Sequence, residues 1–177
     1  ASKSYLPANN EKLRPRTIAS VAQTKVERLA TGIREFDRVL GGGVVPGSLV
    51  LLGGTPGIGK STILLDAGLR FGQQGIKVLY VSGEESEEQT AMRAVRLGGA
   101  QANDNLLILT ATDLDAILAQ ANALKPQLLI IDSIQTMYNP ELQTAAGSVG
   151  QVRECTAKLL QFAKSTGIAV LLIGHVT

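Results

Sequence analysis

The fold is decided by the stretch Gly53-Gly54-Thr55-Pro56-Gly57-Ile58-Gly59-Lys60-Ser61-Thr62, which contains the pattern G-x-x-x-x-G-K-[ST] from Gly54 to Ser61. An apolar run at 48–52 with the length of a buried strand precedes it, and a helix-compatible segment follows at 61–71. Glycines let successive backbone N–H groups of such a loop converge, and the helix N-terminus adds partial positive charge. The stretch therefore predicts a loop that binds polyphosphate.

The polar residues of this loop have predicted roles in binding a nucleoside triphosphate. Lys60 would reach the β and γ phosphates, and the Ser61 hydroxyl would ligate a Mg²⁺ ion held between them. The sequence contains no Asn-Lys-x-Asp element of the kind that selects guanine, so ATP is the expected nucleotide. The alternative is a glycine-rich turn that matches by chance, and the flanking strand and helix argue against it. The predicted nucleotide-binding residues are Gly54, Thr55, Pro56, Gly57, Ile58, Gly59, Lys60, Ser61 and Thr62.

Length and composition favour one globular, soluble domain with a sizeable core. The chain has 177 residues, 45% of them hydrophobic and 18% charged, and no apolar run approaches the length of a membrane span. No hydrophobic segment follows the first residues, so no signal peptide is expected. The single cysteine, Cys155, excludes an internal disulfide and fits a reducing compartment. We therefore expect a cytoplasmic protein without membrane contact.

The N-terminal residues 1–25 differ in character from the rest of the chain. They are polar, are interrupted by Pro7 and Pro15, and show no apolar periodicity, which predicts a basic linker or arm ahead of a core at 26–177. The net charge of +2 is too small to indicate a nucleic-acid partner by itself. A solvated tail and a DNA-contacting arm both remain open.

Apolar runs alternate with helix-compatible segments through the core. Capping boxes are predicted at Ser86 with Gln89 and at Ser148 with Gln151, and Thr112 is predicted to cap a further helix. Strands that read as continuous apolar runs between helices indicate an α/β fold, with a mainly parallel sheet covered by helices on both faces. The predicted strands are 48–52, 77–81, 106–109, 128–132 and 168–173, and the predicted helices are 31–40, 61–71, 86–97, 112–124 and 148–166.

Apolar stripes on two of these helices predict which residues face the core. On the first helix, Val39 lies on the same face as Ile33 and Phe36. On the last helix, Val149 and Cys155 fall on one stripe, so Cys155 is expected to be a core residue and not a nucleophile.

Three further positions follow predicted strands and are candidates for chemistry at the carboxyl edge of the sheet. Asp132 ends a fully apolar strand and would hold the Mg²⁺ hydration shell opposite Ser61, unless it only begins a surface turn. Glu84 is the preferred candidate for orienting the attacking water, with Glu85 second, although acids also favour the first turn of a helix. His175, the single histidine, is suited to contact a γ-phosphate or is a structural residue.

Separated blocks of sequence, in the right order, resemble the RadA/Sms branch of the RecA-like ATPases. The resemblance covers the chain from about Arg28 to Thr177. The blocks are TGIREFDRVLGGG from Thr31, GGTPGIGKST from Gly53, VLYVSGEES from Val78, IDSIQT from Ile131, GSVGQVRE from Gly147 and GHVT from Gly174.

This resemblance implies a RecA-like P-loop NTPase fold in which the Asp132 strand and the 168–173 strand neighbour the phosphate-loop strand. Lys60 and Ser61 match the Walker A residues, Asp132 the Walker B aspartate, and Glu84 the catalytic glutamate. His175 matches the residue that links the γ-phosphate to a DNA-binding loop, and Met137 to Gly147 match a loop facing a ring channel.

The resemblance also implies a function and partners. It indicates a DNA-dependent ATPase that uses ATP and Mg²⁺, binds single-stranded DNA, and assists branch migration in recombination and repair. A homo-hexamer, the recombinase RecA, branched DNA intermediates and a nucleoid location are implied in the same way.

Some features of that family are missing from this sequence. An N-terminal four-cysteine zinc motif, a Lys-Asn-Arg-Phe-Gly motif and a Lon-protease-like domain are absent, and Thr177 falls where a second DNA-contacting segment would begin. We therefore expect a truncated core, for which turnover is in question. The alternatives are an ATP-binding interaction module without turnover and a small-molecule kinase, the latter disfavoured because no lid-like arginine cluster follows the core.

Overall fold

A computed structural model of the chain describes residues 14–54, 58–99 and 104–175. Within them, every pair of neighbouring strands is parallel, and the strand order is β1-β5-β4-β2-β3. The strands are β1 (Leu49–Gly54), β2 (Val78–Ser82), β3 (Leu106–Thr110), β4 (Leu128–Asp132) and β5 (Ala169–His175). The α/β class with a parallel sheet is confirmed.

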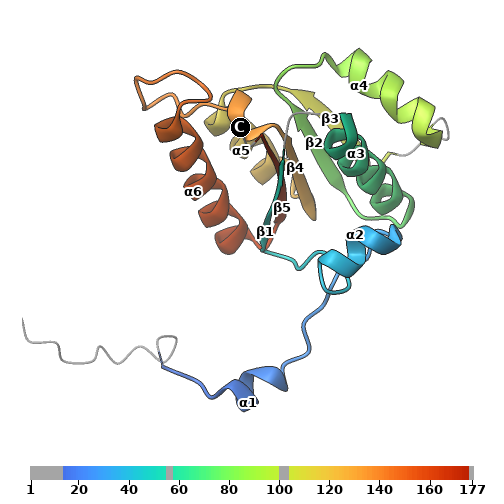
Figure 1. Cartoon of the computed structure of the whole chain (residues 1–177), viewed down its shortest axis with the longest axis vertical. Coiled ribbons are helices and arrows are strands. Elements are labelled where there is room, and N and C mark those ends of the chain that lie inside the picture. Colours follow the sequence, from blue (N-terminus) through green and yellow to red (C-terminus); the bar gives the residue numbers. More distant parts are fainter. Residues whose placement is uncertain (1–13, 55–57, 100–103, 176–177) are drawn as a thin grey trace, which may run out of the picture.

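Helices cover both faces of this sheet (Figure 1). Helices α5 and α6 pack on one face, and α3, with parts of α2 and α4, packs on the other. A π-helical turn, η2 (Val95–Gly99), follows α4, and a 3₁₀ turn, η3 (Ile134–Thr136), follows β4. The helices are α1 (Ile18–Ala22), α2 (Arg34–Val39), α3 (Ile58–Gln73), α4 (Glu87–Ala94), α5 (Leu114–Leu124) and α6 (Val149–Thr166).

The central strands are apolar throughout because both of their faces are buried. In β4, Leu129 and Ile131 join the core under α5 and α6, while Leu128 and Ile130 join the core under α3. Side chains alternate between the two faces of a strand, so a strand between two helix layers needs an apolar residue at every position. Cys155 lies in the α6 core, as expected, and is fully buried.

Strand order corrects one expectation. The strand at 168–173 does neighbour the phosphate-loop strand, but the Asp132 strand does not, because β5 lies between β4 and β1. Strand β1 is an edge strand of the described sheet, as is β3, and Leu51 in β1 is 56% exposed. The expectation taken from the family resemblance was therefore wrong for the Asp132 strand, because one strand separates it from the phosphate-loop strand.

The helix termini differ from the sequence prediction in three places. Asp113, and not Thr112, caps α5, and its carboxylate accepts a hydrogen bond from the Ala116 backbone N–H at 3.2 Å. The box at Ser86 is complete, whereas at Ser148 only the serine half forms. Helix α4 ends at Ala94 and not at 97, because the chain continues as a π-helical turn.

Two valines predicted to face the core are exposed. Val39 is 80% exposed, whereas Ile33, Phe36 and Leu40 on either side of it pack against the core under α3. Val149 is 75% exposed because it is the first residue of α6, ahead of the part of the helix that packs on the sheet.

The described part of the predicted arm contains a short helix that the sequence prediction missed. Thr17 caps α1 by accepting a hydrogen bond from the Ser20 N–H, and every residue of α1 is exposed. Figure 1 shows α1 away from the sheet and its helices. Contact with the rest of the domain is made by Arg28, whose guanidinium donates to the Leu40 carbonyl at 3.1 Å, and by Leu29, which pairs with Val44.

Candidate nucleotide-binding site

The strand register brings most of the predicted site residues to one edge of the sheet. Gly54 at the end of β1 pairs with His175 at the end of β5. Asp132 at the end of β4 pairs with Ser82 at the end of β2, two residues before Glu84. This is the carboxyl edge of the sheet, where parallel α/β folds bind ligands.

The phosphate loop joins β1 to α3 at the same edge. Thr55, Pro56 and Gly57 lie outside the described residues, Gly54 ends β1, and the motif residues from Ile58 onward begin α3. Gly54 has a φ of +153°, and a Cβ atom at this position would lie 3.2 Å from the Lys60 Nζ. Glycine at position 54 therefore lets the lysine ammonium lie against the end of the strand, as the motif requires.

Ser61 and Asp132 are in direct contact. The Ser61 hydroxyl donates to Asp132 Oδ2 at 2.6 Å. These oxygen ligands fit Mg²⁺, which binds few protein groups and completes its shell with phosphate and water oxygens. No cluster of three or more His, Cys, Asp or Glu side chains suited to a metal occurs in the described ranges, so an all-protein metal cage is not formed there. Serine and aspartate together could hold Mg²⁺ only in company with a bound nucleotide.

Tyr80 belongs to this cluster, and the sequence analysis did not identify it. Its hydroxyl donates to Asp132 Oδ2 at 2.7 Å and lies 3.2 Å from the Ser61 Oγ. Burial raises the pKa of Tyr80, and the negative charge of Asp132 raises it further, so the phenol stays protonated and remains a donor. The sequence feature that could have indicated Tyr80 is a single aromatic residue with a hydroxyl group in an otherwise aliphatic strand segment.

The two candidate glutamates have different surroundings. The Glu85 carboxylate accepts a hydrogen bond from the Arg93 guanidinium at 2.6 Å, and the Glu85 carbonyl accepts one from Thr110. The Glu84 side chain is exposed and makes no hydrogen bond or ion pair with the described residues. The Glu85 carboxylate is thus paired with Arg93, whereas the Glu84 carboxylate is exposed to solvent after the strand that neighbours the Asp132 strand.

Backbone contacts hold this segment against Asp132. The Gly83 N–H donates to the Asp132 carbonyl at 3.0 Å, and the Ser82 hydroxyl accepts from the Glu85 N–H at 3.0 Å. A Cβ atom on Gly83 would lie only 2.5 Å from Thr136 Cβ, so the chain passes close to η3 at this point. Only a glycine allows that approach.

His175 is held through its backbone by Gln135. The Gln135 amide donates to the His175 carbonyl and accepts from the His175 N–H, both at 3.1 Å. The imidazole Nδ1 is buried and has no hydrogen-bond partner among the described residues. The histidine thus connects the phosphate-loop strand on one side to η3 on the other.

The predicted channel loop from Met137 to Gly147 has a buried root and an exposed tip. Met137 and Asn139 are buried, and most residues from 140 to 147 are exposed. The buried Gln151 amide accepts a hydrogen bond from the Asn139 N–H at 2.9 Å and donates to the Thr144 carbonyl at 2.9 Å. The capping box lacks its glutamine half because the Gln151 side chain turns into the loop, and the Ser148 N–H donates to the Ala145 carbonyl at 3.2 Å instead.

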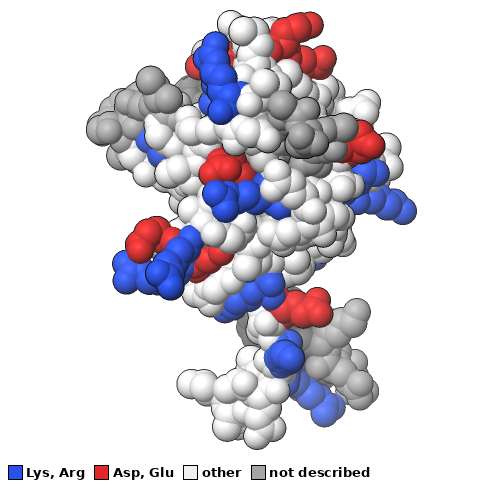
Figure 2. Space-filling model, turned by 90° about the vertical axis from the view of Figure 1, so that its right-hand side faces the viewer, with Lys and Arg blue, Asp and Glu red and all other residues white. Residues whose placement is uncertain are grey.

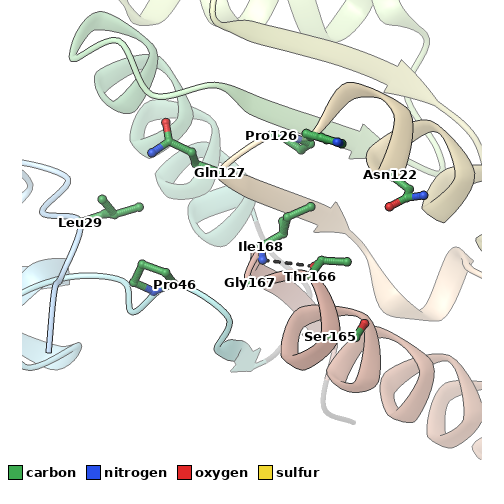
Figure 3. A pocket seen from close by; sticks show the side chains of 10 residues that line it. Leu29, Pro46, Asn122, Pro126, Gln127, Ser165, Thr166, Gly167 and Ile168 are labelled. Atoms are coloured by element: carbon green, nitrogen blue, oxygen red, sulfur yellow. Dashed lines mark hydrogen bonds between the residues drawn. The ribbon is translucent and has the colours of Figure 1, made fainter.

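A large open pocket lies at the other edge of the sheet, away from these groups. It has a volume of about 580 Å³ and is lined by residues that precede strands, among them Pro46, Gln127 and Ile168 (Figure 3). Lys125 is the charged residue in its lining. None of the predicted site residues contributes to this pocket.

Charges are mixed on the side of the molecule where α2, α3 and α4 lie. Figure 2 shows Lys and Arg side chains interspersed with Asp and Glu, without one large basic patch on the side in view. Arg38 and Glu35 lie 3.4 Å apart on α2, and Arg70 and Asp66 lie 3.3 Å apart on α3. Exposed pairs of this kind contribute little to stability.

A parallel α/β sheet, a phosphate-loop motif between β1 and α3, and serine and aspartate joined at the carboxyl edge together define a RecA-like P-loop NTPase domain. Residues 14–177 match the family model described as "AAA domain", and the chain belongs to that family.

The chain is also similar to bacterial proteins named DNA repair protein RadA. It is 48% identical to that of Halalkalibacterium halodurans, over 100% of this chain and 38% of the relative. It is 50% identical to that of Streptococcus pneumoniae, over 94% of this chain and 39% of the relative. For Escherichia coli the identity is 50%, over 90% of this chain and 34% of the relative.

The chain therefore spans little more than a third of the length of the curated relatives it matches. The resemblance to the RadA/Sms ATPase core that the motifs indicated is confirmed. In the part of the chain that the structure describes, no helix combines the length and the apolar character of a membrane span.

Proposed function

We propose that this chain is the ATP-binding and ATP-hydrolysing core of a DNA repair protein of the RadA type. The observation that carries the proposal is the 2.6 Å contact between Ser61 of the motif helix and Asp132 of a separate strand. A phosphate-loop serine beside a strand-end carboxylate is the arrangement that P-loop NTPases use for Mg²⁺ and triphosphate. The similarity to RadA proteins supplies the DNA repair part of the proposal.

Each site residue has a proposed role. Ser61 and Asp132 hold Mg²⁺, and Lys60 binds the β and γ phosphates with the backbone of Gly54 and its neighbours. When bound, Mg²⁺ neutralises charge that develops on the phosphate oxygens. Glu84 orients the attacking water and accepts its proton, in preference to Glu85, whose carboxylate is paired with Arg93.

His175 is proposed to detect the γ-phosphate and to transmit its presence to the loop from Met137 to Gly147. Its position beside Gly54 and its two hydrogen bonds with Gln135 support this role. Gln135 belongs to η3, which leads directly into that loop. Binding of single-stranded DNA by the loop, ring assembly, contact with RecA and branched DNA, and a nucleoid location complete the proposal for the whole protein.

Nucleotide binding and turnover test the proposal separately. We expect Lys60→Ala to lose most ATP affinity, because it removes the cation that contacts the triphosphate, while the exposed α6 control Lys164→Ala keeps it. Glu84→Gln is expected to bind ATP and Mg²⁺ normally but to lower hydrolysis by at least about 100-fold, within the range typical of a lost general base. Normal hydrolysis in Glu84→Gln with loss in Glu85→Gln would reverse the assignment of the base.

Assays with and without single-stranded DNA separate the alternatives. ATP binding without turnover under both conditions would support an interaction module, and phosphorylation of a small molecule would support a kinase. Wild-type ATP affinity in Lys60→Ala would refute the site itself.

A further inference from the structure

A chain of polar contacts connects the proposed metal site to helix α4. The Glu85 carboxylate pairs with the Arg93 guanidinium at 2.6 Å, and Arg93 lies 3.4 Å from the Tyr80 hydroxyl. Tyr80 in turn donates to Asp132 at 2.7 Å, and Ser61 donates to the same carboxylate oxygen. The contacts join groups from α3, α4, β2 and β4 around one point.

Packing alone does not account for the polar atoms in this chain of contacts. Tyr80 is fully buried in the middle of β2, where a phenylalanine would fill the same space without a hydroxyl to satisfy. A buried hydroxyl is costly unless it is hydrogen-bonded, and this one contacts Asp132, Ser61 and Arg93. The Arg93 Nε is also buried, without a partner among the described residues. Buried polar groups of this kind need an explanation other than filling the core.

The contacts restrict the orientation of the Asp132 carboxylate. Two donors, the hydroxyls of Ser61 and Tyr80, approach Oδ2, while Oδ1 accepts no hydrogen bond from the described residues. Two donors on one oxygen select a single rotamer and leave the other oxygen for a metal ion or its water. When Ser61 is engaged by a metal ion, Tyr80 is the donor that still holds the carboxylate.

We propose that Tyr80 is a positioning residue for the metal-binding carboxylate of Asp132, and that the Arg93–Glu85 pair holds the Tyr80 hydroxyl in place. The inference rests on the proposed function, because it assigns Asp132 to the metal. It also gives Glu85 a definite role as the anchor of Arg93, next to Glu84. Helix α4 and the metal site are thereby linked by hydrogen bonds and not only through the backbone of β2.

Metal affinity tests the proposal without relying on turnover. Binding of Mn²⁺, as the probe for Mg²⁺, is measured by electron paramagnetic resonance on the 177-residue chain with a non-hydrolysable ATP analogue. We expect Tyr80→Phe to weaken Mn²⁺ binding by about 10-fold, the lower end for loss of an outer-shell partner. Binding of the analogue in EDTA stays within about twofold of the unsubstituted chain, since no phosphate contact is changed. The control Tyr138→Phe removes a hydroxyl that has no hydrogen bond in the described residues and leaves both values unchanged.

Arg93→Met tests the second half of the proposal. Arg93→Met should weaken Mn²⁺ binding by about threefold in the otherwise unsubstituted chain. In a Tyr80→Phe background it should cause no further loss of Mn²⁺ affinity, because both changes act through the same hydroxyl. If Tyr80→Phe does not fold by circular dichroism, Arg93→Met alone decides.

Other results of these measurements would contradict either the positioning role or the proposed function. Unchanged Mn²⁺ affinity in folded Tyr80→Phe, full additivity of the two changes, or an equal loss in Tyr138→Phe would each overturn the positioning role. An unsubstituted chain that binds neither the analogue nor Mn²⁺ with it would instead refute the proposed function.

Discussion

Replacing Gln151 with methionine should destabilise the domain by about 2–3 kcal/mol, because the change removes a buried amide that anchors the loop after η3. The Gln151 side chain is fully buried, and its two short hydrogen bonds run to the Asn139 N–H and the Thr144 carbonyl. Each lost hydrogen bond lowers the free energy of unfolding by about 1 kcal/mol. The Asn139 N–H, in a residue only 5% exposed, would also be left without an acceptor, which costs about 1 kcal/mol more. Thr144 is exposed, so water replaces its lost donor.

Urea denaturation followed by circular dichroism measures this loss, with Gln161→Met as the control. Gln161 lies on the same helix but is exposed, so its replacement should change stability by less than about 0.5 kcal/mol. Faster hydrogen exchange at the Asn139 amide would locate the effect in the loop. A loss below about 0.5 kcal/mol for Gln151→Met, with unchanged exchange at Asn139, would refute the anchoring role.

Two further changes probe the packing around the site. Gly83→Ala should cost about 1–3 kcal/mol in urea denaturation, because its methyl group would overlap Thr136. Gly150→Ala, whose added methyl group meets nothing within 4 Å, should be neutral or stabilising, and an equal loss in both variants would contradict this explanation. Cys155 should react with a thiol reagent about 10-fold or more slowly in the native chain than in urea, because burial both shields the thiol and raises the pKa of Cys155. Equal rates in the two conditions would show that α6 does not cover it.

The candidate residues of the proposed nucleotide site could be selected from the sequence. The spacing from Gly54 to Ser61 specifies a phosphate loop because only that order of glycines, lysine and serine supplies converging amides, a cation and a metal ligand. Asp132 was predicted as a metal-site residue from its place at the end of an apolar strand. Cys155 was predicted as a core residue from its place on an apolar stripe, and its burial is confirmed. In each of these positions, the deciding information lies within a few neighbouring residues.

The tertiary structure decided which distant groups meet. Ser61 and Asp132 are 71 positions apart, and their 2.6 Å contact depends on the order and register of the strands. The tertiary structure also decided that β5 lies between β1 and β4 and that Tyr80 lies beside Asp132. It likewise decided that Glu85, and not Glu84, pairs with Arg93. The spacing of apolar residues along the chain predicts whether a residue is buried, but it does not predict which residues pack against it. Hydrogen bonds between separate elements are therefore the part of this site that only the folded chain specifies.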